Sequence, residues 1–104
     1  MSAGRFFASS LTLSQRTVAT GVTLDASDYT VLCDAAAAGF TVTLPAAALC
    51  KCNVINIKKI DVTANAVTVA ANGAEKIDGQ ATQVITAPYT NMLITSDGSN
   101  WYIL

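Results

Sequence analysis

The segment TNMLITSDGSNWYIL, residues 90–104, decides the fold class, because it places the only tryptophan and several bulky apolar residues directly after a turn. It predicts a β-hairpin in which strands at 91–95 and 101–104 flank a loop rich in Ser, Asp, Gly and Asn. In the second strand, apolar side chains alternate between the two faces, and a strand that is apolar on both faces is usually buried on both. We therefore expect a second subunit to cover one face. The predicted self-association residues are Trp101, Tyr102, Ile103 and Leu104.

Most of the chain after residue 16 has the same period of two. Thr, Val and Ile alternate in short runs, separated by turn-forming Asp, Asn, Ser and Gly. The clearest runs are residues 17–24, 29–33, 40–44 and 55–58. Two alanine-rich segments, at 35–38 and 45–51, are each too short for more than one helical turn. The pattern predicts an all-β domain over residues 16–104, built as an antiparallel β-sandwich or barrel of short strands.

Residues 1–15, MSAGRFFASSLTLSQ, have neither strict alternation nor turn residues. We predict that they form an extended N-terminal arm that docks on a neighbour, with the adjacent phenylalanines as its anchor. The alternative is an additional first strand that packs on the chain's own core. The residues expected to make the contacts of this partner-binding arm are Arg5, Phe6, Phe7, Leu11 and Leu13.

The composition favours a protein that assembles with others. Charged residues make up 12% of the chain, about half of the usual ~25%, and the net charge is -1. Such a surface carries little self-repulsion, and it offers no basic face for nucleic acid. The adjacent pair Lys58 and Lys59 is predicted to lie on a solvated strand face or edge. Because serines and threonines interrupt the apolar residues near the N-terminus, we expect neither a signal peptide nor a membrane span.

The residues needed for catalysis are missing from the sequence. It contains no histidine, which removes Ser-His and Cys-His arrangements, and it contains no phosphate-binding glycine loop. We expect Asp25 and Asp28 to cap a turn, and we expect no enzyme activity, no catalytic residues and no cofactor. The cysteines, Cys33, Cys50 and Cys52, are too few for a zinc site without histidine, so no metal is expected. A disulfide from Cys33 to Cys50 or Cys52 stays open beside the interpretation of buried free thiols.

Three segments together resemble a known module. They are VTLDASDYTVLCDAAAAGFTVTLPAAA at 22–48, VINIKKIDVTANAVTVAANGAEKIDGQAT at 54–82, and MLITSDGSNWYIL at 92–104. The chain from residue 21 onward resembles a β-rich structural module of tailed-bacteriophage virion proteins. That module occurs in tail-fibre and baseplate-associated proteins and in small head or decoration proteins. The resemblance implies a structural role, often as a trimer, with no catalytic residues to transfer.

The resemblance leaves the location in the virion open, and the length of the chain leads us to expect the head. The printed chain has no room for a fibre shaft, so we expect a capsid cement (decoration) protein that binds across capsomer junctions. Its expected partners are itself, as a homotrimer, and the major capsid protein or another virion protein, with no nucleic acid and no membrane. Its expected location is the virion, assembled in the host cytoplasm. The alternative is a tail-fibre or baseplate component, with host-glycan binding through Tyr29, Tyr89, Trp101 and Tyr102 as a further variant.

Overall fold

The computed structural model describes residues 12–104, and these residues fold almost entirely into short β-strands. The strands are β1 (Gln15–Val18), β2 (Val22–Thr23), β3 (Thr30–Cys33), β4 (Phe40–Thr43), β5 (Val54–Lys59), β6 (Val67–Ala70), β7 (Thr82–Ile85), β8 (Asn91–Ser96) and β9 (Trp101–Ile103). One 3₁₀ turn, η1 (Ala47–Leu49), follows Pro45 and confirms the predicted helical turn there. The all-β prediction is therefore confirmed.

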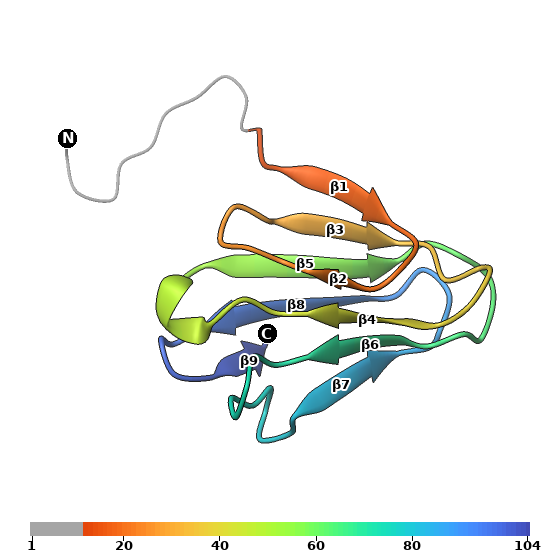
Figure 1. Cartoon of the computed structure of the whole chain (residues 1–104). Coiled ribbons are helices and arrows are strands. Elements are labelled where there is room, and N and C mark those ends of the chain that lie inside the picture. Colours follow the sequence, from red (N-terminus) through yellow and green to blue (C-terminus); the bar gives the residue numbers. More distant parts are fainter. Residues whose placement is uncertain (1–11) are drawn as a thin grey trace.

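The strands form two mixed sheets that lie one on the other (Figure 1). The first sheet has the order β1-β3-β5-β8-β9 and the second has the order β2-β4-β6-β7. From β1 to β6 the chain passes from one sheet to the other after every strand. As a result, β1, β3 and β5 run parallel in one sheet, and β2, β4 and β6 run parallel in the other. The chain thus winds as a flattened spiral. Antiparallel pairing then adds β7 beside β6 in one sheet and β8 beside β5 in the other.

The predicted antiparallel sandwich or barrel is not confirmed, because the pairings from β1 to β6 are parallel and the sheets do not close into a barrel. The run at 17–24 explains the difference. It reads as one alternating strand, but the chain leaves the first sheet after Val18 and enters the second at Val22. A connection that changes sheets lets the next strand in the same sheet keep its direction, whereas a hairpin reverses it. Alternation reports which side chains are buried, and it contains no information about strand direction.

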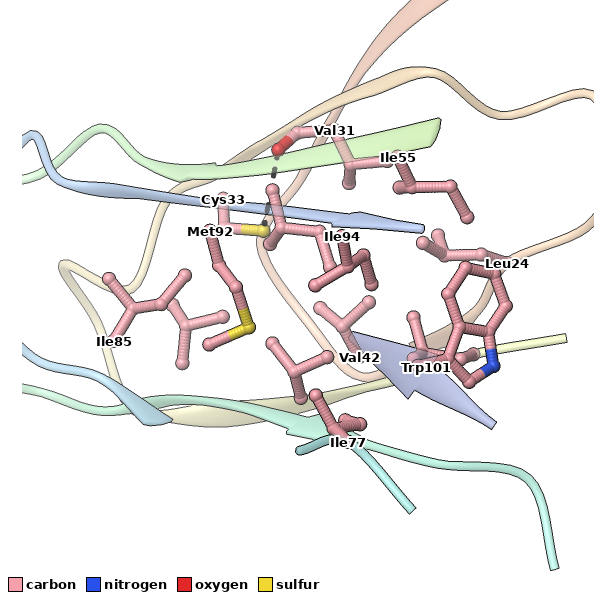
Figure 2. Packing of buried hydrophobic residues seen from close by; sticks show 14 of the residues in the cluster. Leu24, Val31, Cys33, Val42, Ile55, Ile77, Ile85, Met92, Ile94 and Trp101 are labelled. Carbon is pink, nitrogen blue, oxygen red and sulfur yellow. Dashed lines mark hydrogen bonds between the residues drawn. The ribbon is translucent and has the colours of Figure 1, made fainter. Parts of the chain in front are cut away.

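The parallel register stacks like residues on one another in the core. Val31 of β3 pairs with Ile57 of β5, and Val22, Val42 and Val69 align across the second sheet. Val31, Ile57, Val42 and Val69 are fully buried, and the partly buried Val22 packs against them. Figure 2 shows Val31 and Val42 among the side chains of this core. Burying an aliphatic side chain of this size contributes about 1.5–3 kcal/mol, so the aligned ladders are a main source of stability.

The C-terminal hairpin is confirmed, with β8 and β9 paired antiparallel. In its loop, the Asp97 carboxylate accepts the backbone N–H groups of Ser99 and Asn100, both at 2.8 Å, and Gly98 adopts a positive φ of 96°. This turn directs Trp101 into the core, where its side chain is fully buried. Figure 2 shows its indole beside Leu24, at the opposite end of the cluster from Ile85 and Met92. The last strand therefore completes the core of its own chain.

Candidate docking surface

A groove of about 380 Å³ opens on the side of the sandwich where β7 and β9 lie. The core residues Ile85 and Met92 line it together with Val84 and Ile103, whose side chains are partly exposed. Its other lining residues are small or polar and include no charged side chain: Gln83, Thr86, Ala87, Thr90 and Asn91. An uncharged groove that reaches the edge of the core suits an apolar segment of a protein partner.

The two strands beside the groove differ in how their outer edges are covered. The outer edge of β9 is occupied, because the Trp101 N–H donates to the Lys76 carbonyl at 2.8 Å and the Trp101 carbonyl accepts the Asp78 N–H at 3.0 Å. The Asp78 carboxylate also accepts the N–H of Ile103 at 3.1 Å. By contrast, β7 is the last strand of its sheet and has a strand partner only in β6. Backbone pairing with an added strand is therefore open at β7 and blocked at β9.

The predicted self-association residues of the last strand are divided between core and surface. Trp101 is 0% exposed, so in this fold it contributes through its own core. Tyr102, Ile103 and Leu104 are 43%, 37% and 68% exposed and are available for contact. The nearby charge of Asp97, together with the hydrogen bond that its carboxylate accepts from the Tyr102 hydroxyl, raises the pKa of Tyr102.

Most of the predicted arm falls outside the described residues, namely Arg5, Phe6, Phe7 and Leu11. Leu13 is described, and its side chain is 47% exposed. The arm joins the domain at Ser14, whose hydroxyl donates to the Ser27 carbonyl at 2.6 Å and accepts the Tyr29 N–H at 3.0 Å. The prediction places residue 15 in the arm, and β1 begins at Gln15.

Asp25 and Asp28 organise the turn before β3, as predicted. The Asp25 carboxylate accepts the Ser27 N–H at 2.8 Å, and the Asp28 carboxylate accepts the Asp25 N–H at 2.9 Å. Asp28 also receives two hydrogen bonds of 2.9 Å from the guanidinium of Arg16, which ties β1 to this turn. The hydrogen bonds from Ser27 hold the pKa of Asp25 below its ordinary value. These carboxylates are occupied by structural contacts.

The prediction of a solvated Lys58-Lys59 pair is wrong for Lys59, which is fully buried. Its ammonium donates to the Asp61 carboxylate at 2.7 Å and to the Thr63 carbonyl at 2.6 Å. On β5 it follows Ile55 and Ile57 on the inward face, and this spacing is the signal that could have identified it. Lys58 points the other way, and its ammonium donates to the Tyr89 carbonyl at 2.9 Å.

Asp61 is the centre of this buried polar cluster, which joins the β3–β4 connection to the β5–β6 connection. Its carboxylate also accepts the Ala35 N–H at 2.9 Å, the Thr63 N–H at 3.0 Å and the Thr63 hydroxyl. Burial opposes ionisation of Asp61, but the hydrogen bonds from Lys59, Thr63 and Ala35 outweigh it and hold its pKa well below the ordinary value. The cluster is fully hydrogen-bonded, which is the condition for a buried ion pair to be tolerated.

The three cysteines are free thiols in this structure. Cys33 and Cys50 are buried, whereas Cys52 is exposed and has a positive φ of 68°. Burial raises the pKa of the Cys33 thiol to about 12, and burial is also the main cause of the raised pKa of Cys50. Neither buried thiol is therefore activated as a nucleophile.

The four aromatic residues considered for glycan stacking do not share one face. Trp101 is buried, Tyr29 precedes β3, Tyr89 lies in the β7–β8 connection and Tyr102 lies on β9. The strands β5 and β8 separate β3 from β9, which places Tyr29 and Tyr102 about 14 Å apart across the sheet at ordinary strand spacing. The aromatic side chains do not gather into a stacking platform.

The described part of the chain, residues 12–104, holds neither a candidate metal site nor a membrane-spanning helix. No group of three or more His, Cys, Asp and Glu residues lies close enough together there to hold a metal ion. In the same part of the chain, no helix has the length and apolar character needed to cross a membrane. Comparison of the chain with protein-family models, with curated proteins and with solved structures found no match in any of the three.

Proposed function

We propose that the protein is a structural component of a bacteriophage virion, acting as a capsid cement (decoration) protein that binds across capsomer junctions. The resemblance of residues 21–104 to a virion module motivates this proposal. The observation that carries it is the uncharged groove beside β7, whose lining includes the exposed apolar side chains of Val84 and Ile103. A surface of this kind suits protein contact, and its partners would be further copies of the chain and a capsid protein.

A cement protein needs a rigid fold and several weak contacts with the capsid, and it needs no catalytic residues. A protein that binds only the assembled capsid stabilises that state by mass action. If the protein is a trimer, three copies contact the capsid at once, so that weak individual contacts add up to tight attachment. The spiral with its aligned core supplies the rigid body. We propose no catalytic activity, because the sequence has no histidine and the buried acid of residues 12–104, Asp61, is committed to hydrogen bonds.

A tail-fibre or baseplate component is the second candidate, because the resemblance covers both classes of virion protein. Its host-glycan variant has less support, since Trp101 is buried and the exposed tyrosines Tyr89 and Tyr102 belong to different elements. A glycan site usually offers aromatic faces gathered on one surface.

The deciding experiment is immunogold electron microscopy on particles of the phage whose genome encodes this chain. Particles grown without the gene serve as the control for antibody specificity. We expect label on the head, and we expect particles that lack the protein to release their DNA at a lower temperature. Label on the tail with unchanged head stability would reject the cement function and support the second candidate. Particles that carry no label at all would reject both.

A further inference from the structure

The groove beside β7 has no occupant within the described chain, although it meets several requirements for binding an extended segment. The buried residues Ile85 and Met92 line it together with the exposed residues Val84 and Ile103. The neighbouring strand β7 ends its sheet, so its outer backbone groups can pair with an added strand. Apolar pockets next to a free strand edge are the arrangement by which sheets bind extended peptides.

We propose that this groove binds residues 1–11 of a second copy of the chain. Residues 6–11, FFASSL, carry no charge, as do all the residues that line the groove. In an extended segment alternate side chains share a face, so Phe7 and Leu11 enter the groove together. The polar rim of Gln83, Thr86 and Asn91 then faces the serines between them. The inference concerns self-association and does not depend on the virion function.

The position of the arm shows why the donor is a second copy and not the same chain. The arm joins the domain at β1, whereas the groove is lined by the start of β8 and by Ile103 of β9, which are three and four strand positions away in the same sheet, and by β7 of the other sheet. Three to four strand spacings of about 4.8 Å make that crossing about 14–19 Å. From Ser14 to Leu11 the chain reaches at most about 11 Å when fully extended. Leu11 of the same chain therefore falls short of the groove, so the donor is a second copy.

The arrangement joins two predicted sets of residues into one interface. The arm residues Phe7 and Leu11 of one copy would contact Ile103, a predicted self-association residue, on the next copy. Because the two surfaces differ, the contact is head-to-tail, and such contacts form closed rings when the rotation between copies closes. A trimer is one such ring.

The test is complementation between two variants of the full chain, followed by sedimentation velocity. The groove variant is Val84→Lys, in which an exposed side chain changes on an edge strand that tolerates lysine. The arm variant is the double substitution Phe7→Ser and Leu11→Ser. Val62→Lys is the matched control, because Val62 is also an exposed valine and lies outside the groove. Circular dichroism verifies that each variant keeps its β structure.

We expect the wild type and Val62→Lys to form the same oligomer, and we expect each of the other two variants to self-associate at least about tenfold more weakly. A mixture of those two variants should form a one-to-one complex, because the intact arm of one fits the intact groove of the other. A monomeric wild type would overturn the proposal, and so would a variant that keeps wild-type assembly. Two folded monomeric variants that do not complement each other would show that the arm and the groove do not contact each other, which also overturns the proposal.

Discussion

Gly39 precedes β4 and lies against the backbone of Ala66, just before β6, so an alanine at this position tests the parallel packing of these strands. A Cβ on Gly39 would lie 2.7 Å from the Ala66 carbonyl oxygen and 3.2 Å from the Ala66 nitrogen. Ordinary contact begins at 3.4 Å, so the two backbones would have to separate by about 0.7 Å. The same carbonyl accepts the Phe40 N–H at 3.1 Å, and the displacement would strain that hydrogen bond as well.

We expect Gly39→Ala to lower the free energy of unfolding by about 1–3 kcal/mol, the usual cost of overpacking, out of a total of about 5–15 kcal/mol. Gly21→Ala is the matched control, because its Cβ would meet the Thr41 carbonyl at an ordinary 3.5 Å, and we expect a change within about 0.5 kcal/mol. Neither glycine has a positive φ, so backbone strain does not enter the comparison. Urea unfolding followed by tryptophan fluorescence measures both. A Gly39→Ala protein as stable as the wild type would refute the close approach of these two backbones.

Three further predictions concern buried groups. Folding lowers the pKa of Asp61, so the ionised carboxylate stabilises the protein above the ordinary carboxyl pKa of about 3.9, and this stabilisation is lost as the pH falls below that value. Asp61→Asn should therefore lower the urea midpoint at pH 7 and make the midpoint depend less on pH between 5 and about 2. Parallel curves of midpoint against pH for the variant and the wild type would contradict this. In the native protein a thiol reagent should modify the exposed Cys52 rapidly, whereas the buried Cys33 should react only after unfolding. Mass spectrometry of the labelled peptides measures both rates, and equal rates would contradict the burial of Cys33. The fluorescence emission of Trp101 should shift to longer wavelength on unfolding. Trp101→Ala should lower the free energy of unfolding by about 3–5 kcal/mol, and a variant of unchanged stability would mean that the indole is outside the core.

The sequence predicts local features such as the last hairpin, but not the pairing of strands that are distant in sequence. The hairpin expected at 91–95 and 101–104 agrees with β8 and β9 to within a residue at each end, because its loop residues and alternation are local signals. The parallel spiral depends on where the chain crosses between sheets, and the connection at 19–21 has no residue pattern that distinguishes a sheet change from a bend within one strand.

The groove and the buried lysine were missed for different reasons. The residues of the groove all lie within 83–103, but β7 belongs to one sheet and β8 and β9 to the other, so the groove exists only once both sheets are assembled. Lys59 had a readable signal, since it continues the inward series of Ile55 and Ile57. The general expectation that lysines are solvated outweighed that signal, because only the fold brings Asp61 and Thr63 to its ammonium.

The late position of Trp101 has a consequence for how the protein is made. Synthesis on the ribosome proceeds from the N-terminus, so β1 to β7 emerge before β8 can take its place beside β5. Until Trp101 follows, the nascent chain lacks the largest side chain of its core and leaves apolar surface uncovered. A prematurely terminated product that stops before β9 would therefore be a substrate for chaperones and proteases. Only chains translated through β9 would therefore reach the pool of folded protein.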